Sequence, residues 1–465
     1  MERVRIQIPK HNMDQQSASS PPPAFTLVAA LLGFFVITLD AVVVNVALPT
    51  IGRELGAEMS GLQWVVDSYT MVFAALLLSA GVITDRIGAR NAFGLGVAIF
   101  MSASVVCGLA PDTLTLILAR LLQGAGAAIM MPSSMALIRH AYHDPVKRGR
   151  AVAYWAMGGS VAATSGPVVG GLLILLSWRW IFFVNLPVCL LTFALLTRVE
   201  PTEKRVTRFD LWGQITAVAA MGLLIFSAIE GGEIGWGRPQ VWGSLLLGAC
   251  AVVAFVIGQR RVRHPMVPPE LFRVRNAVIA LAVGFTFMMG YFGLPFVMSL
   301  YLQQLRGLSP LQTGLSFLPM MLIGLFLTPF SARIVERFGA RAVIFSGLVS
   351  MVLGLFCMAL LADGLPIAGI SVLMGLVGLA GPLIAPPIAE VLLGSVPAPL
   401  AGTASGAFNT SRQVGGALAV AVFGALLAQP FGFVNGMRVS LLLATVVALL
   451  TAWCSLSLRP VSAPA

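Results

Sequence analysis

Charged residues are scarce in this chain of 465 residues: they make up 10% of it, whereas hydrophobic residues make up 58%. Soluble proteins carry about 25% charged and about 45–50% apolar residues. A chain this apolar cannot cover its own core with polar surface. The composition therefore excludes a water-soluble globular enzyme and predicts a protein embedded in a lipid bilayer.

Signatures of nucleotide, metal and catalytic sites are also missing. No lysine follows a glycine, so no phosphate-binding loop for ATP is present, and neither a G-x-S-x-G elbow nor a strand-linked G-x-G-x-x-G occurs. The five cysteines all lie in apolar runs, where they act as small hydrophobic residues. His140 and His143 lack the further ligands that zinc requires. We therefore expect no catalytic residue, no metal and no cofactor.

Long apolar stretches dominate the chain, and fourteen of them can cross about 30 Å of hydrocarbon as helices. The predicted spans are 25–48, 62–83, 91–110, 113–138, 150–172, 178–197, 210–231, 240–259, 276–301, 310–331, 342–361, 366–391, 403–428 and 437–457. The expected fold is thus an all-α membrane protein. Residues 1–24 are polar and are expected to form a cytosolic tail.

An internal repeat divides the spans. Residues 81–90 read G-V-I-T-D-R-I-G-A-R after the second span, and residues 331–341 read S-A-R-I-V-E-R-F-G-A-R after the tenth. A repeat shifted by eight spans predicts two six-helix bundles related by a pseudo-two-fold axis, with two extra helices between them. The expected domains are 25–200, a linker at 201–275 that holds spans seven and eight, and 276–465.

The position of the basic residues predicts the orientation. Of the 29 lysines and arginines, 22 lie in the tails and loops on one side of the predicted spans and five on the other. By the positive-inside rule, both termini lie in the cytoplasm. The net charge of +11 thus reflects orientation in a bacterial plasma (inner) membrane, and no nucleic-acid partner is expected.

Four ionisable residues lie well inside the predicted spans: Asp40, Asp67, Arg120 and Arg412. A charge in hydrocarbon is costly, so each is a candidate functional residue. Asp40, Asp67 and Arg120 are expected at similar depth in the outer leaflet. Two interpretations remain open: a structural ion pair between Asp40 and Arg120, or a proton and substrate site in which burial and a nearby arginine switch an aspartate between its two forms.

Two further features concern movement of the helices. Glu390 and Arg412 are candidates for a gate pair on the cytosolic side. The fifth span contains S-G-P-V-V-G-G at 165–171, in which Gly166 and Gly170 form a face of small residues and Pro167 removes a helical hydrogen bond. This helix could bend or slide against a partner, or pack in a tight static crossing.

Together these segments resemble the major facilitator superfamily, and within it the drug:proton antiporters with fourteen spans. The matching segments are L-D-A-V-V-V-N-V-A-L-P (39–49), the 81–90 loop, A-R-L-L-Q-G-A-G-A-A (119–128), G-P-V-V-G-G (166–171), W-R-W-I-F-F-V-N-L-P (178–187) and A-G-T-A-S-G-A-F-N-T-S-R-Q-V-G-G (401–416). The resemblance implies export of small, often hydrophobic or cationic compounds in exchange for protons, with Asp40 and Arg120 taking part in proton coupling.

The resemblance also implies roles for two groups of residues. Those of the antiporter helix are Gly166, Pro167, Gly170 and Gly171. Those of a cytoplasmic lock between the halves are Gly81, Asp85, Arg86, Gly88 and Arg90, with Glu336 and Arg337 as second-half counterparts.

The expected partners are a small-molecule substrate, protons and the lipid bilayer, and we expect a monomer. An exporter dedicated to one metabolite, such as an antibiotic or an amino acid, is the main alternative. A membrane-embedded enzyme or receptor would need an intramembrane nucleophile, a metal constellation or a soluble signalling domain, and the sequence contains no sign of these.

Overall fold

The computed structural model describes residues 23–204, 209–262, 265–397 and 400–459, and these contain helices and no strand. Thirteen helical segments are long and apolar enough to cross a membrane, and Trp180–Leu196 is a shorter apolar segment. The all-α, fourteen-span prediction is confirmed. Of the predicted cytosolic tail, all but residues 23 and 24 lie outside the described residues.

The helices before the linker are α1 (Pro23–Leu55), α2 (Met59–Ile87), α3 (Ala89–Leu109), α4 (Thr113–Ala141), α5 (Pro145–Ile174), α6 (Trp180–Phe183) and α7 (Asn185–Leu196). The linker contains α8 (Leu211–Glu233) and α9 (Pro239–Arg261). The second half contains η1 (Pro269–Arg273), α10 (Arg275–Leu300), η2 (Tyr301–Leu305), α11 (Pro310–Ser316), α12 (Leu318–Leu327), η3 (Thr328–Phe330), α13 (Ser331–Phe338), α14 (Ala340–Leu361), α15 (Ile367–Gly378), α16 (Ala380–Ser395), α17 (Ala401–Leu427) and α18 (Phe433–Ser455).

Three spans predicted as continuous helices are broken. The breaks fall at Val184, Phe317 and Leu379, each two or three residues before a proline. Proline has no N–H to donate to the preceding turn, and its ring crowds that turn, so the helix is interrupted there. The tenth span is therefore built from α11, α12, η3 and α13, and it continues to Phe338, beyond the predicted end at 331.

The repeated loops adopt the same turn. Gly88 joins α2 to α3 with φ 87° and ψ 143°, and Gly339 joins α13 to α14 with φ 80° and ψ 144°. A positive φ is disfavoured for residues with a Cβ, so glycine is required at both positions. The sequence repeat thus corresponds to one local structure formed twice.

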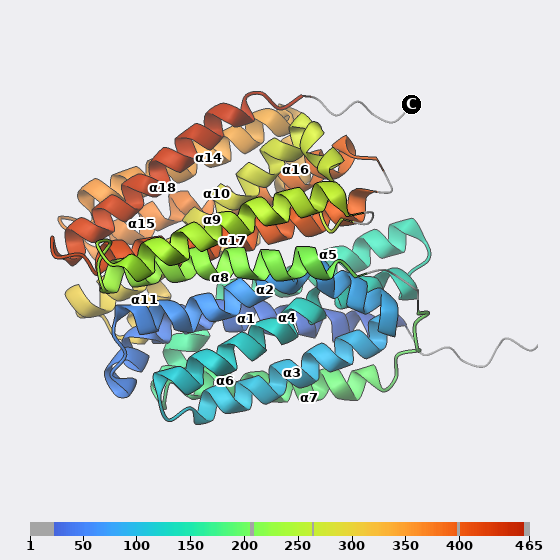
Figure 1. Cartoon of the computed structure of the whole chain (residues 1–465), viewed down its shortest axis with the longest axis horizontal. Helices are drawn as coiled ribbons and strands as arrows, with labels where there is room; N and C mark the ends of the chain where they lie inside the picture. Colours follow the sequence, from blue (N-terminus) through green and yellow to red (C-terminus); the bar gives the residue numbers. More distant parts are fainter. Residues whose placement is uncertain (1–22, 205–208, 263–264, 398–399, 460–465) are drawn as a thin grey trace, which may run out of the picture.

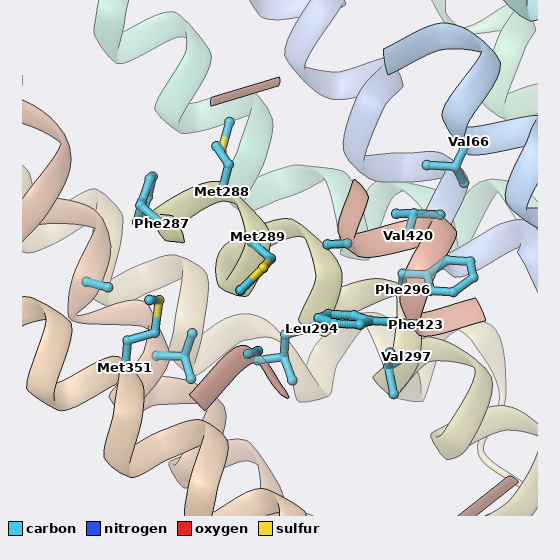
Figure 2. Packing of buried hydrophobic residues seen from close by; sticks show 14 of the residues in the cluster. Val66, Phe287, Met288, Met289, Leu294, Phe296, Val297, Met351, Val420 and Phe423 are labelled. Atoms are coloured by element: carbon cyan, nitrogen blue, oxygen red, sulfur yellow. The ribbon is translucent and has the colours of Figure 1, made fainter. Parts of the chain in front are cut away.

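The two halves lie side by side along their length, with α8 running beside the boundary between them (Figure 1). We call this boundary the seam; α1, α2 and α5 of the first half contact α10, α11, α12 and α17 of the second across it. Helix α8 packs against both α2 and α17, so the linker covers one side of the seam. Figure 2 shows Val66 of α2 beside Val420 of α17, within a hydrophobic cluster shared by both halves.

The bundle has two ends, which we name by their loops. The α1–α2 end contains residues 56–58, and the α2–α3 end contains Gly88. Because the number of spans is even, the first and last helices α1 and α18 have their outer termini at the same end, the α2–α3 end.

Candidate transport site

Asp40 lies inside the first half and not on the seam. It is completely buried, and it accepts hydrogen bonds from Arg120 Nη1, from Gln123 Nε2 at 2.8 Å and from Asn185 Nδ2 at 2.8 Å. These partners come from α4 and α7. Three donors, one of them charged, thus surround the carboxyl group and exclude water from it.

The guanidinium of Arg120 is likewise supplied with hydrogen-bond acceptors. Its Nε donates to Val65 O at 3.1 Å, its Nη1 also donates to Gln123 Oε1 at 2.7 Å, and its Cζ lies 4.2 Å from the ring centroid of Tyr69. The guanidinium therefore joins α1, α2 and α4 through charge, hydrogen bonds and a cation–π contact. This geometry is that of an ion pair that holds the helices of one half together.

We expect Arg120→Gln to lower the stability of the protein strongly. Removing one partner of a buried pair leaves the carboxylate of Asp40 uncompensated, which costs about 3–5 kcal/mol. Thermal unfolding of the purified protein in detergent measures the loss. Arg438→Gln is the control, because Arg438 is exposed and pairs with Asp363 at the surface, where a pair contributes about 0–1 kcal/mol. Equal unfolding temperatures for the two variants would contradict this role.

Asp67 differs from Asp40 in both position and partners. It is completely buried, its Oδ2 has no hydrogen-bond partner, and its Oδ1 accepts only from Thr70 Oγ1 at 3.5 Å. Gln63 and Met71, one helical turn away on either side, contact α17 and its neighbours. Residues four apart share a helix face, so Asp67 lies on the face of α2 toward the seam. The carboxyl of Asp67 thus has one weak donor and, among the described residues, no counter-charge.

The three charges that the sequence places at similar depth do not form one cluster. Asp40 and Arg120 meet, as the sequence suggested, but Asp67 forms no salt bridge with Arg120 or with any other described residue. The helical periodicity of α2 explains the separation. The backbone carbonyl of Val65 faces Arg120 on α4, whereas Asp67, two residues further along, lies on roughly the opposite side of the helix axis.

Hydrogen bonds join the halves at the α1–α2 end. Ser299 Oγ donates to Asn45 O at 2.7 Å, Gln303 Nε2 donates to Val46 O at 3.0 Å, and Gln63 Nε2 donates to Ala421 O at 2.6 Å. Each bond connects a side chain of one half to a backbone carbonyl of the other. The seam is thus closed at this end.

Proline explains why one of these carbonyls is available. Pro49 lies inside α1 and has no N–H, so the carbonyl of Asn45, four residues earlier, loses its helical partner. The hydroxyl of Ser299 from α10 supplies the missing hydrogen bond. Sequence reasoning missed Ser299, although the proline in the motif at 39–49 indicated an unpaired carbonyl in α1.

The glycines of the antiporter helix α5 face two different partners. A Cβ at Gly166 would lie 3.0 Å from Val42, and one at Gly170 would lie 2.7 Å from Val43, both in α1 of the same half. A Cβ at Gly171 would lie 2.6 Å from Leu311 Cα in the second half. Facing it, Gly314 of α11 leaves space for Pro167 O, which a Cβ would approach to 2.1 Å. Sequence reasoning did not identify Gly314.

At the α2–α3 end, the proposed lock residues do not join the halves. Asp85, Arg86, Glu336 and Arg337 are all exposed, and no salt bridge forms between them in the part of the chain that the structure describes. Gly81 has open space around it. Arg90 instead binds within its own half, since its Nε donates to Leu196 O at 3.2 Å and its backbone N–H donates to Thr202 Oγ1 at 3.2 Å.

The two residues of the predicted gate pair do not meet in the described structure. Glu390 is exposed near the end of α16, whereas Arg412 lies near the middle of α17, and the described residues include no salt bridge between them. The difference in depth along the two helices explains this result. The described residues also contain no group of three or more His, Cys, Asp or Glu side chains placed to hold a metal ion.

Two bundles of membrane-spanning helices, joined across the seam at the α1–α2 end by hydrogen bonds from side chains to backbone carbonyls, have the architecture of a secondary transporter. The profile of the Major Facilitator Superfamily matches residues 30–420. The chain belongs to this family, and its relatives are transporters, not enzymes.

Known relatives support this assignment over most of the chain. The multidrug resistance protein Stp of Mycobacterium tuberculosis is 38% identical over 87% of this chain and 75% of its own. A methylenomycin A resistance protein of Streptomyces coelicolor is 33% identical over 93% of this chain and 92% of its own. A crystal structure of a D-xylose–proton symporter superposes with a TM-score of 0.67 at 15% identity, covering 95% of this chain and 98% of that one, which shows the shared fold.

Proposed function

We propose that this protein exports small amphiphilic compounds from a bacterial cell in exchange for protons. Relatives that confer resistance to drugs support the direction of transport. The observation that carries the proton coupling is the buried carboxyl of Asp67, which lies on the seam with one oxygen unpartnered. A side chain in this position can take up and release a proton as the seam closes and opens around it.

The distribution of basic residues supports an orientation with the α2–α3 end, and hence both termini, in the cytoplasm. The closed α1–α2 end then faces outward. In this orientation, the structure corresponds to the state that receives a compound from the cytoplasmic side. Both halves of the transport path belong to one chain, so a monomer suffices for the cycle.

The two aspartates have different roles in this proposal. Asp67 carries the proton, since its environment favours the neutral form and a water-filled seam would favour the ionised one. Asp40 and Arg120 position α1 and α4 within the first half. This assignment differs from the family resemblance, which implies proton coupling at Asp40 and Arg120, because three donors hold Asp40 within the first half.

The lock and the antiporter helix act in the change between states. When the cytoplasmic end closes, Asp85 and Arg86 approach the second half, and Glu336 and Arg337 approach the first. At the same time Gly171 of α5 separates from Leu311 of α11. The exposed lock residues and the close contact at Gly171 support this sequence of movements.

Everted membrane vesicles test the function. We expect vesicles containing the protein to accumulate the lipophilic dye ethidium when their lumen is acidified, and addition of ethidium to raise the lumenal pH as protons leave in exchange. Vesicles from cells without the protein are the control. Accumulation that is equal with and without the pH gradient would contradict proton coupling, and absence of accumulation of any lipophilic compound would contradict export.

A further inference from the structure

Arg412 is a cation near the middle of a membrane-spanning helix. It is the twelfth residue of α17 (Ala401–Leu427), which has 27 residues. At about 1.5 Å per residue it lies roughly 16 Å from the start of the helix. An arginine at this depth is costly unless it is paired, and such residues commonly mark a pathway for substrate or ions.

The surroundings of Arg412 leave most of its hydrogen-bonding capacity unused. In the described chain it forms no salt bridge, and its buried Nε has no hydrogen-bond partner. Its polar contacts with side chains are weak: Nη1 lies 3.4 Å from Asn409 Oδ1, and Nη2 lies 3.9 Å from Met288 Sδ. A guanidinium has five N–H donors and stays protonated in proteins. Several donors of Arg412 therefore lack an acceptor of matching strength.

The comparison with Arg120 shows that the lack of acceptors is a property of the site around Arg412. Both arginines lie within membrane-spanning helices of the same chain. Arg120 is 1% exposed and has a carboxylate, an amide oxygen and a backbone carbonyl as acceptors. Arg412 is partly exposed and has no carboxylate. The first half neutralises its internal arginine completely, whereas the second half leaves its own open.

Aromatic side chains frame the guanidinium. Its Cζ lies 5.9 Å from the ring centroid of Phe287 and 5.7 Å from that of Phe408. Phe287 and Met288 follow each other on α10 in the region that Figure 2 shows. Phe287 and Phe408 are only 4% and 5% exposed, so in this state the rings form a buried apolar wall beside the guanidinium.

A chain of contacts connects this site to the seam. The ring of Phe287 packs against that of Tyr291 at 5.1 Å between centroids, and Tyr291 Oη contacts Met321 Sδ at 3.7 Å. The carbonyl of Met321 in turn accepts a hydrogen bond from Thr164 Oγ1 of α5, in the first half, at 3.4 Å. Phe287 is thus linked through Tyr291 to Met321, which contacts the first half directly.

We propose that Arg412, with Phe287 and Phe408, forms a subsite that recognises the carboxylate of an amphiphilic organic acid during export. The planar fork of a guanidinium matches the two oxygens of a carboxylate, and the rings match an apolar body. This inference rests on the proposed function as an exporter. It extends the substrates beyond the hydrophobic and cationic compounds that the family resemblance implies.

Binding to the purified full-length protein in detergent tests the subsite without a proton gradient. The probes are pyrenebutyrate, its uncharged amide and a trimethylammonium analogue with the same ring, and equilibrium dialysis measures their affinities. We expect wild type to bind the carboxylate at least about tenfold more tightly than the amide, as charge-assisted hydrogen bonds imply. Arg412→Gln should remove this preference and change binding of the amide less than twofold. Arg412→Lys should retain part of the preference for the carboxylate, because lysine keeps the positive charge but lacks the planar guanidinium.

Two outcomes would overturn the proposal. One is a wild-type protein that binds pyrenebutyrate no more tightly than the amide, or binds neither; this comparison needs no variant and so does not depend on how a variant folds. The other is an equal loss for all three probes in Arg412→Gln, which would indicate a structural role. Arg438→Gln is the control for removing a positive charge elsewhere. Failure of proton-driven ethidium accumulation, in contrast, would contradict the exporter while leaving these affinities unchanged.

Discussion

Asp67→Asn should abolish proton-driven accumulation of ethidium in everted vesicles while leaving exchange of ethidium between the two sides of the membrane intact. Asparagine resembles the neutral form of the carboxyl in size and polarity but cannot release a proton. The variant can therefore bind and move a compound without coupling that movement to the pH gradient. We expect gradient-driven accumulation to fall at least about tenfold, whereas counterflow of labelled against unlabelled ethidium should stay within about twofold of wild type.

The reason lies in the surroundings of Asp67. The structure supplies its carboxyl with one hydrogen bond of 3.5 Å, from Thr70, and leaves Oδ2 unpartnered. Across the seam, Ala417 and Ala421 belong to the apolar cluster that Trp64 and Met71 of α2 pack against. In the closed seam an ionised carboxylate would lack both water and a counter-charge, so proton uptake favours closure at this end.

Asp112→Asn is the matched control for Asp67→Asn. Asp112 caps the N-terminus of α4 by accepting a hydrogen bond from the backbone N–H of Thr115 at 2.8 Å. Asparagine caps helices about as well as aspartate, so the control loses a carboxylate without losing structure. Undiminished gradient-driven accumulation in Asp67→Asn would remove Asp67 from the coupling mechanism. Loss of counterflow as well would indicate a role in binding or folding instead.

Gly314→Ala should hold the protein away from the state that the structure shows. A Cβ at this position would lie 2.1 Å from the carbonyl oxygen of Pro167, and this neighbour is backbone, which cannot rotate aside. Overpacking of this kind costs about 1–3 kcal/mol. The contact exists only when α5 and α11 meet, so the substitution destabilises only the state that is closed at the α1–α2 end. The ratio of the two states therefore shifts toward the opposite state by about five- to 150-fold.

Hydrogen–deuterium exchange measures this shift directly. We expect faster exchange of the backbone amides of α11 and of residues 164–171 in Gly314→Ala, together with a loss of transport of about tenfold or more. Gly243→Ala is the control, since Gly243 also lies within a helix and a Cβ there would meet nothing within 4 Å. Exchange and transport equal to wild type in Gly314→Ala would show that the contact between α5 and α11 does not limit closure.

The sequence by itself determined the features that depend on local composition and spacing. Length and hydropathy predicted the fourteen spans, because the thickness of the hydrocarbon layer sets how many apolar residues a helix needs. The repeated loop motif predicted two halves and a linker, and the structure places Gly88 and Gly339 in the same turn. The pairing of Asp40 with Arg120 followed from their similar depth in the first half.

Only the tertiary structure decided which internal aspartate is paired with an arginine and which remains without a counter-charge. Asp40 and Asp67 look alike in the sequence, yet one has three donors and the other has an unpartnered oxygen. Nothing in the sequence marks Ser299 and Gly314, because their roles depend on contacts of α10 and α11 with the first half. The physical reason is that burial and pairing depend on neighbours 80 or more residues away in the chain, which helical periodicity and hydropathy do not encode.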